Sequence, residues 1–325
     1  MDLSVVLCTH NRCESLARAL RSIVAQDGLD GVTWEVAVVD NGSTDATAAV
    51  VEGAAARSSV ALRYLREPEI GLCRARNRGV AATGAPYIAF TDDDIVAEPR
   101  WLANLYGTIR EERCAVAGGR IRVRSPREMP PWVDRTLLGC LGELDLGARR
   151  VPMDGVESYP FGANMIFERR ALQSAGLFDE SLGRRGEGRR WWQLVKGEEQ
   201  EIVGRILRDG GRSIYAPDAI LWHCIRAEQV SKGFFRRLYF AAGHQFMVAR
   251  DPSSGPKVSG FAWECCTATF WWMKSRIQHG ADRSLGRELD VMFKLGMLAA
   301  LCRRRWASAA SSVARDPRYP RSLAR

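Results

Sequence analysis

Three consecutive aspartates, Asp92, Asp93 and Asp94, directly follow the apolar run "YIAF". Alternate side chains of an extended segment point the same way, so Asp92 and Asp94 are expected to converge while Asp93 points elsewhere. Two converging carboxylates repel each other unless a cation lies between them. A few oxygen ligands suit Mg²⁺ or Mn²⁺, completed by phosphate oxygens and water. The pattern predicts a metal and phosphate site, with a solvated acidic loop or a helix cap as the simpler alternative.

Two earlier apolar runs also end in polar residues. Thr9 follows "LSVVLC", and Asp40 ends "WEVAVVD", where an acidic side chain can accept hydrogen bonds from a ribose or a base. The following "GST" offers backbone N–H groups, although a turn that caps a helix explains Ser43 and Thr44 equally well. Asp40 is therefore the stronger candidate for contact with a nucleotide.

The elements that must position these side chains alternate between strand and helix over the first 120 residues. Four strand-like runs, "LSVVLC", "WEVAVVD", "ALRYLRE" and "PYIAF", are separated by segments with helical spacing. This order predicts an α/β fold with a mostly parallel, Rossmann-like sheet flanked by helices. Because the carboxyl ends of parallel strands share one edge, the three polar loops are expected to meet there.

Composition narrows the class of protein. The chain has 325 residues, of which 46% are hydrophobic, so it can bury a large core. It has no apolar run of roughly 18 residues and no signal-peptide pattern, and we therefore expect a cytoplasmic protein. Nine cysteines without a CxxC pair favour neither a disulfide framework nor a zinc site.

Charge is distributed unevenly along the chain. From Arg226 onward, 18 basic and 7 acidic residues give a net charge of +11, whereas the preceding residues carry −2. This excess indicates an anionic partner for the C-terminal region. Segments from Lys232 onward have the spacing of amphipathic helices with aromatic residues and basic flanks. They suit a peripheral membrane surface, at the inner face of the membrane, or a homodimer interface better than nucleic acid.

Two enzyme classes compete for the strand and loop pattern. A Rossmann oxidoreductase needs glycines in the turn after the first strand, so that the pyrophosphate of the dinucleotide can approach the backbone. That turn here is "CTHNR", which contains no glycine and argues against this class. An aspartyl phosphohydrolase also places DxD after an apolar strand, as in "IAFTDDDIV". That class carries the motif on its first strand, whereas at least three strands precede it here. A non-catalytic nucleotide-binding protein at a membrane is a third alternative.

Several motifs together resemble the family 2 glycosyltransferases of the GT-A fold. They run in order from Asp2 to about His223 and read "LSVVLCTHNR", "VVDNGSTD", "GLCRARNRGVAATGAPYIAFTDDDI", "FGANMIFERRALQSAGLFDE" and "GEEQEIVGRILRDGGRSIYAPDAILWH". The resemblance implies transfer of a sugar, with inversion, from a nucleotide-diphospho-sugar. The donor is usually a UDP- or dTDP-sugar, and a divalent cation assists.

The resemblance also assigns roles on the nucleotide side of the site. Asp40 matches the base-binding aspartate of the family, and Asp94 matches the direct metal ligand, with Asp92 or Asp93 nearer the ribose. The remaining nucleotide-side matches are the first loop, Thr9, Asn11 and Arg12, and the arginine of "ARN", Arg76.

The "ED" pair of the family appears here as Glu198 and Glu199, so Glu199 occupies the place of the usual catalytic aspartate. An inverting displacement needs a base that removes the acceptor hydroxyl proton, and neighbouring acids can raise the pKa of such a carboxylate. The segment "EEQEIVGRIL" also suits the acidic first turn of an amphipathic helix, and the two interpretations are compatible. Which of the two glutamates reaches the acceptor stays open.

Four further residues are candidates on weaker grounds. His223 is a possible extra metal ligand, with a structural buried histidine as an equal alternative. Trp191 and Trp192 precede the glutamates and suit stacking on an acceptor sugar or packing on the sheet. Asn164, in "FGAN", is a candidate for the donor sugar or the acceptor by resemblance alone.

These patterns together predict a GT-A catalytic domain over residues 1–225. Its nucleotide-sugar-binding half is expected at 1–120 and its acceptor-side half at 121–225, followed by a basic helical region at 226–325. The acceptor is unknown from the sequence. A lipid-linked saccharide and a natural-product or carrier-bound intermediate both fit.

Overall fold

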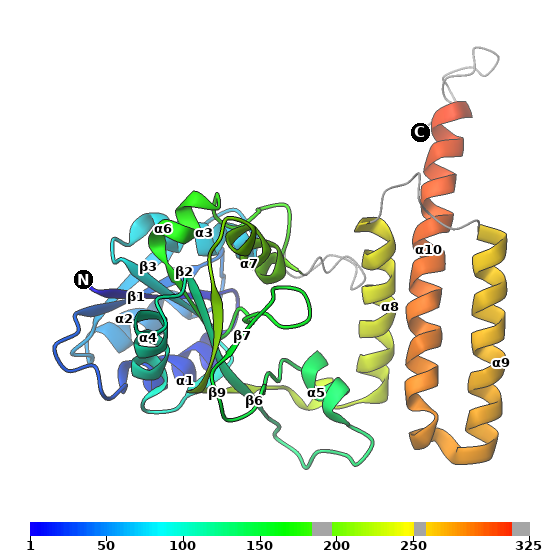
Figure 1. Ribbon diagram of the computed structural model, residues 1–325, viewed down its shortest axis with the longest axis horizontal. Coiled ribbons are helices and arrows are strands. Elements are labelled where there is room, and N and C mark those ends of the chain that lie inside the picture. Colours follow the sequence, from blue (N-terminus) through cyan, green and yellow to red (C-terminus); the bar gives the residue numbers. More distant parts are fainter. Residues whose placement is uncertain (184–196, 250–257, 314–325) are drawn as a thin grey trace. The chain divides into compact units, whose positions relative to one another are not determined.

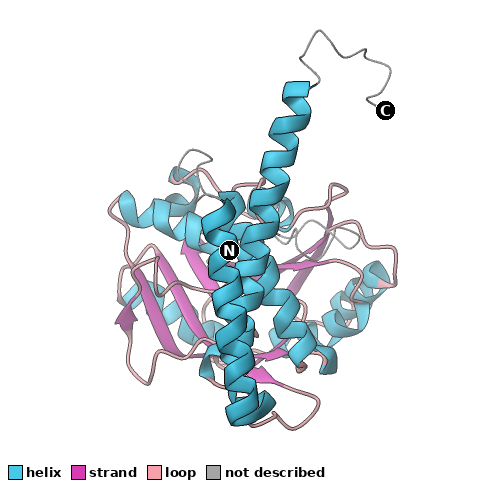
Figure 2. Cartoon of the chain, turned by 90° about the vertical axis from the view of Figure 1, so that its right-hand side faces the viewer, coloured by secondary structure: helices cyan, strands magenta, loops and turns pink. Residues whose placement is uncertain are grey.

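A computed structural model of the chain describes residues 1–183, 197–249 and 258–313. The chain folds as two compact units (Figure 1). Within the described residues, the first unit runs from Met1 to Ala227 apart from Pro130–Trp132. The second unit comprises that short segment and the residues from Glu228 onward. Among the residues that the structure describes, all strands belong to the first unit, and the second unit is mainly helical. Figure 2 colours the strands and helices differently.

The order of elements in the first unit alternates strand and helix, as the sequence predicts. Its elements are β1 (Leu3–Thr9), α1 (Cys13–Val24), β2 (Trp34–Asp40), α2 (Thr47–Ala55), β3 (Ala61–Arg66), α3 (Leu72–Ala82), β4 (Tyr87–Asp92), β5 (Ile95–Ala97), α4 (Trp101–Glu111), β6 (Val116–Arg124), α5 (Arg135–Cys140), β7 (Val151–Pro152), β8 (Met165–Glu168), α6 (Arg169–Ser174), α7 (Glu198–Arg208), β9 (Ser213–Cys224) and the start of the 3₁₀ helix η2 (Ala227–Gln229). The second unit contains α8 (Lys232–Ala249), α9 (Val258–Arg283) and α10 (Leu285–Val313).

The strands form one sheet in the order β3-β2-β1-β4-β8-β6-β9-β5, with β7 beside β9. The first four strands in that order are parallel, as predicted, and their register aligns Thr9 with Asp40 and Cys8 with Asp92. From β8 onward the sheet is mixed, because β8 runs antiparallel to both β4 and β6. The fold is thus α/β with a parallel half and a mixed half.

Helices cover both faces of the sheet, because the strands are apolar on both sides. Leu3, Val5 and Leu7 of β1 join a buried cluster with residues of α1, α2 and α4. Val6 and Cys8 point to the opposite face and join a second cluster with residues of α3, α6 and α7. This alternation follows from the two-residue period of a strand. It places α3 and α7 on the same face of the sheet.

A glycine sets how closely α3 approaches β1. A Cβ atom at Gly79 would overlap the side chain of Val6, so only glycine allows this packing. Arg76 lies one turn earlier on the same helix and is buried. The close approach therefore fixes Arg76 near the carboxyl edge of β1 and β4.

In the second unit, α10 packs against both α8 and α9. A Cβ at Gly243 of α8 would overlap the backbone of Phe293 in α10, and one at Gly296 of α10 would overlap that of Phe240 in α8. These two glycines let the α8 and α10 backbones touch. Gly280 interrupts the helical backbone near the end of α9. Over the described ranges, none of the helices carries an apolar stretch long enough to cross a membrane.

Candidate active site

The sheet brings together the three polar loops that follow β1, β2 and β4. Thr9 pairs with Asp40 in the register of β1 and β2, and Asp92 ends β4 beside Cys8 of β1. The side chains after these strands consequently share the carboxyl edge of the parallel half, where ligands bind in sheets of this kind. The gathering of these loops at one edge agrees with the expectation from topology.

Asp93 is turned into the protein and held by two residues of the first loop. The Thr9 hydroxyl donates a hydrogen bond to Oδ2 of Asp93 at 2.7 Å. Arg12 Nη1 lies 3.1 Å from Asp93 Oδ1 and 2.7 Å from Asp94 Oδ2. Burial raises the pKa of Asp93 to about 6, although Arg12 opposes the shift. The sequence predicted only that Asp93 points elsewhere than Asp92 and Asp94, and it did not reveal that Arg12 links Asp93 to Asp94.

His223 lies beside Asp94 because β5 and β9 pair at Ile95 and His223. Its Nε2 is 3.4 Å from Asp94 Oδ1, and its Nδ1 is 2.7 Å from the carbonyl oxygen of Leu141. A carbonyl oxygen only accepts, so Nδ1 carries a hydrogen and Nε2 faces the carboxylate. Burial lowers the pKa of His223, but the hydrogen bond and charge of Asp94 outweigh it and the net pKa is raised.

The pair formed by Asp94 and His223 fits a divalent cation. A carboxylate oxygen and a neutral imidazole nitrogen are suitable ligands, and the Leu141 carbonyl fixes the tautomer that leaves Nε2 available. Within residues 1–183, 197–249 and 258–313, no group of three His, Cys, Asp or Glu side chains is arranged to hold a metal ion. A cation here would need ligands from a bound phosphate and water in addition to the protein, which is usual for Mg²⁺.

Arg76, which is 2% exposed, joins the two glutamates of α7. Its Nη2 lies 3.1 Å from Glu199 Oε1, and its Nη1 lies 3.7 Å from Glu198 Oε1. The ring of Phe178 supports the guanidinium, with 5.4 Å between the ring centroid and Cζ. In the described chain, Arg76 Nη1 and Glu198 Oε2 are buried without a hydrogen-bond partner. The structure places Arg76 with the acidic pair, and the nucleotide-side role that the resemblance implies for it stays a prediction.

Asp92 connects the two groups of charges electrostatically. Burial raises its pKa, Arg76 opposes the rise, and the charges of Asp94 and Glu199 add to it. Asp92 is therefore near both the Asp94 end and the Glu199 end of the site. Burial also raises the pKa of Glu198, and the neighbouring charge of Glu199 raises it further. This concentration of buried carboxylates favours a bound cation.

Gly162 is a site residue that the sequence did not reveal. A Cβ at this position would overlap Arg76 Nη2 and Glu199 Oε1. Any larger residue would therefore displace the ion pair between these two side chains. The only sequence signal is the glycine in "FGAN", two residues before Asn164, and a glycine at a loop carries no such meaning without the fold.

The loops after β1 and β2 brace each other. Asp40 is 3% exposed and accepts hydrogen bonds from the Tyr64 hydroxyl at 2.6 Å and the Ser43 backbone N–H at 2.8 Å. Asn11 has a positive φ of 51° and accepts from the Thr44 backbone N–H at 2.8 Å. Both side chains thus hold the loop geometry, and base binding by Asp40 stays a prediction.

Asn41, next to Asp40, also organises this edge. It is 6% exposed, its amide nitrogen donates to the carbonyls of Glu67 and Glu69, and its amide oxygen accepts from the Gly71 N–H at the start of α3. The amide links the loop after β2 to the segment that leads into α3.

Asn164 has a different place from the one expected. It is fully buried, its amide oxygen accepts from Trp101 Nε1 at 2.8 Å, and its amide nitrogen donates to the carbonyls of Arg120 and Ala219. These bonds occupy the amide and join the residue before β8 to α4, β6 and β9. Asn164 thus has a structural role here, in place of the expected contact with the donor sugar or the acceptor. Trp191 and Trp192 lie outside the described residues.

The family model of glycosyl transferase family 2 matches residues 4–175 of the sequence, which is more than half of the chain. The chain belongs to glycosyl transferase family 2. The matched residues contain the loops after β1, β2 and β4 together with Arg76 and Gly162. They stop before α7, so the match does not include Glu198 or Glu199.

Curated relatives of this family 2 chain act on different molecules, as their names state. The pre-mycofactocin glycosyltransferase of Mycobacterium tuberculosis is 26% identical over 77% of this chain, and the match covers 48% of that protein. The chain thus spans about half the length of that relative. The glucosyl-dolichyl phosphate glucuronosyltransferase of Haloferax volcanii is 28% identical, over 69% of each chain.

Solved structures share the fold. A mannosyltransferase from Pyrobaculum calidifontis, in complex with GDP-Man and Mn²⁺, has a TM-score of 0.54 and 19% identity, covering 96% of this chain and 80% of its own. TarS of S. aureus, residues 1–349 with UDP-GlcNAc, has a TM-score of 0.53 and 16% identity, covering 94% and 92%. These likenesses establish the GT-A glycosyltransferase fold of this chain.

Proposed function

We propose that this chain transfers a sugar from a nucleotide-diphospho-sugar to an acceptor hydroxyl, with inversion and with the help of a divalent cation. Family membership favours this function over the aspartyl phosphohydrolase and the non-catalytic nucleotide-binding protein. The observation that carries the proposal is the pairing of Arg76 with Glu199 next to Asp92, whose other electrostatic neighbours are Asp94 and His223. The residues that we assign to the base and to the cation thus interact electrostatically through Asp92, as action on one substrate requires.

Glu199 is the residue that we assign as general base. Its side chain is 17% exposed, against 6% for Glu198, so it is the better placed of the two to meet an acceptor. Arg76 Nη2 donates a hydrogen bond to Glu199 Oε1, and we assign the second oxygen to the acceptor hydroxyl. Glu199 takes the hydroxyl proton as the acceptor oxygen bonds to the anomeric carbon and the bond to the diphosphate breaks.

Asp94 and His223 are the residues that we assign to the cation, Mg²⁺ or Mn²⁺. When bound, such an ion stabilises the negative charge that develops on the departing diphosphate. Arg12 bridges Asp93 and Asp94 and keeps both carboxylates in place at this end of the site. Thr9 holds Asp93 from the other side, so the loop after β4 is preorganised before any ligand arrives.

The donor and the acceptor are proposed at the level of class. A UDP- or dTDP-sugar is our first choice of donor, with Asp40 near the base. GDP-Man in the Pyrobaculum structure makes GDP-sugars a necessary comparison. A lipid-linked saccharide is supported by the name of the Haloferax relative, and a natural-product or carrier-bound intermediate by that of the mycobacterial one.

A thermal-shift screen of UDP-, dTDP- and GDP-sugars with Mn²⁺ tests the donor proposal. A ligand that binds only the folded state raises the apparent melting temperature, and we expect one nucleotide class to do so with Mn²⁺ and much less without it. Donor hydrolysis or transfer with and without EDTA then tests the cation. Activity that survives chelation unchanged would remove the role we give to Asp94 and His223.

A further inference from the structure

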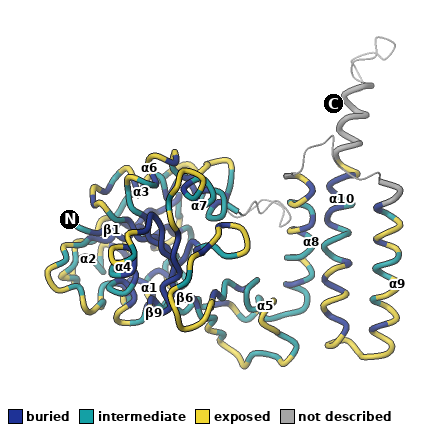
Figure 3. The backbone as a smooth tube through the Cα atoms, viewed as in Figure 1, coloured by how far each residue is buried: buried dark blue, intermediate teal, exposed yellow. Residues whose placement is uncertain are grey.

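The outer face of α9 carries a row of exposed apolar side chains. Trp263, Phe270, Met273 and Ile277, which we call the outer stripe, are 71%, 61%, 55% and 86% exposed. Trp263, Phe270 and Ile277 are spaced by seven residues, and Met273 lies three residues after Phe270. All four therefore lie along one side of the helix. Figure 3 marks long exposed stretches on this helix. The stripe is roughly 20 Å long at 1.5 Å per residue.

The second unit does not need the outer stripe for its own core. Phe261 and Cys265, on the opposite side of α9, are buried in a cluster with Met297, Ala300 and Leu301 of α10 and Met247 of α8. The helix therefore already has a packed face, and the outer stripe is additional apolar surface. A contiguous exposed apolar row that contains two aromatic rings is typical of an interaction site rather than of free surface.

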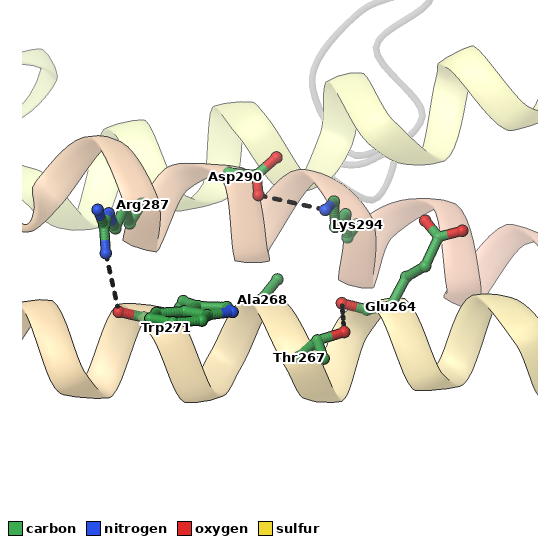
Figure 4. Close-up of a pocket in the computed structure, with 7 residues that line it drawn as sticks. All are labelled: Glu264, Thr267, Ala268, Trp271, Arg287, Asp290 and Lys294. Atoms are coloured by element: carbon green, nitrogen blue, oxygen red, sulfur yellow. Dashed lines mark hydrogen bonds and ion pairs between the residues drawn. The ribbon is translucent and has the colours of Figure 1, made fainter.

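A polar flank borders the stripe on the side of α10. A cavity of about 320 Å³ lies between the two helices, and Trp271 of α9 and Arg287 and Lys294 of α10 are among the residues that line it. Figure 4 shows these side chains. Asp290 lies 3.4 Å from Lys294, and Lys274 Nζ lies 5.1 Å from the centroid of the Trp271 ring. The apolar surface of α9 is thus one-sided. A one-sided helix with tryptophan and lysine at its border is suited to lie in an interface.

Charge decides what kind of interface this is. The chain from Arg226 onward has 18 basic and 7 acidic residues, and Lys274 and Arg276 are exposed on α9 itself. Two copies of such a basic unit repel each other, whereas an anionic lipid surface attracts it. The acidic Asp282 and Asp290 are each paired with a lysine, Lys232 and Lys294, which reduces their opposition to such a surface.

We propose that α9 docks in the plane of an anionic lipid bilayer through the outer stripe, with the surrounding lysines and arginines contacting the phosphate headgroups. The stripe enters the boundary between headgroups and acyl chains, and the polar flank stays in water. This surface belongs to the second unit and involves none of the residues assigned to sugar transfer. Loss of lipid binding and loss of transfer can therefore be separated by experiment.

The test is co-sedimentation of the full-length chain with vesicles of phosphatidylcholine, with and without phosphatidylglycerol. We expect binding to be at least tenfold stronger on the anionic vesicles and to weaken strongly between roughly 0.1 M and 1 M salt. The double variant Trp263→Ser/Phe270→Ser should lose at least tenfold in binding and keep donor hydrolysis. The matched control is Val156→Ser in the first unit, which removes a side chain that is 70% exposed.

Circular dichroism and the melting temperature show whether each variant folds. If the double variant does not fold, Ile277→Asp takes its place. Absence of sedimentation with anionic vesicles, equal binding to neutral vesicles, or undiminished binding by the stripe variants would each overturn the proposal. A dimer in light scattering that the stripe substitutions dissociate would also overturn it, because a second copy would then cover the stripe.

Discussion

Two arginines in this chain are each held between two adjacent carboxylates, and they differ in exposure. Arg12 lies between Asp93 and Asp94 and is 31% exposed, whereas Arg76 lies between Glu198 and Glu199 and is 2% exposed. Arg12 follows β1 on a loop, while Arg76 is fixed by the packing of α3 on the sheet. We call Arg12, Asp93 and Asp94 the open cluster, and Arg76, Glu198 and Glu199 the closed cluster. The open cluster can exchange contacts when a ligand arrives, and the closed cluster cannot do so without a loss of stability.

This difference assigns separate tasks to the two clusters. In the open cluster, water and ligand phosphates can reach the guanidinium of Arg12, which suits a group beside a bound cation and diphosphate. In the closed cluster, low exposure makes the pairing strong but leaves any single charge costly if its partner is removed. The closed cluster is therefore expected to set the position of the base, and the open cluster the binding of the donor.

The largest effect is expected for Glu199→Gln, which removes the base and keeps the size of the side chain. Transfer should fall by roughly 10² to 10⁴, the usual contribution of a general base, while donor affinity changes by less than about threefold. Turnover by single-substrate kinetics and donor binding by calorimetry measure the two quantities. The matched variant is Glu198→Gln, for which a smaller loss of transfer is expected.

Two outcomes with these variants would contradict the assignment of Glu199 as the base. Near-normal turnover in Glu199→Gln together with a large loss in Glu198→Gln would make Glu198 the base. A loss of donor affinity equal to the loss of turnover would instead place Glu199 on the donor side and contradict the division between the two clusters.

The second effect concerns stability and compares Arg76→Met with Arg12→Met. Removal of Arg76 leaves two glutamates without their buried partner, so we expect a loss of about 3–5 kcal/mol in the free energy of unfolding. Arg12 is partly exposed, and its removal should cost about 1 kcal/mol or less while weakening donor binding. Urea denaturation measures the free energy of unfolding of both variants, and titration with a nucleotide-sugar measures donor binding. Equal losses of stability would show that the two clusters do not differ as described.

A smaller effect is expected for Gly162→Ala, because the added methyl group overlaps Arg76 Nη2 and Glu199 Oε1. Overpacking of this kind costs about 1–3 kcal/mol, and a shift of the base by a fraction of an ångström should lower turnover on the order of tenfold or more. Gly84→Ala is the control, because a Cβ there meets nothing within 4 Å. Unchanged turnover in Gly162→Ala would mean that the ion pair does not position the base.

The sequence predicted the open cluster better than the closed one. Thr9, Asp40 and the three aspartates each follow an apolar run, so strand order alone places them at one edge. The linkage of Arg12 to Asp93 and Asp94 depends on how the loop after β1 turns, which strand patterns do not specify. The α/β fold was predictable for the same reason, whereas the antiparallel insertion of β8 between β4 and β6 was not.

The closed cluster depends on contacts between distant parts of the chain. Arg76 and Glu199 are 123 residues apart, and their meeting requires α3 and α7 to share one face of the sheet. Gly162 matters only because of that meeting, so no local pattern indicates its role. Asn164 shows the opposite case, since a motif position suggested ligand contact while its side-chain amide bonds to Trp101, Arg120 and Ala219.

The smallest predicted effect is a pH dependence of stability that comes from Glu198. Burial and the charge of Glu199 raise the pKa of Glu198 above its ordinary value of about 4.5. As the pH rises past that value, the unfolded chain releases this proton before the folded chain does, so ionisation of Glu198 costs stability until its folded pKa is passed. Glu198→Gln lacks this cost. The variant should therefore gain in unfolding free energy, relative to the wild type, as the pH rises from about 4 towards 7.

Urea midpoints of both proteins at several pH values measure this difference. Asp92 and Asp93 also have raised pKa values, but they are present in both proteins and their contributions largely cancel in the comparison. A difference that stays constant with pH would mean that Arg76 already compensates the charge of Glu198 fully. In that case the closed cluster would be a balanced ion pair, and its low exposure would not by itself distinguish it from the open cluster around Arg12.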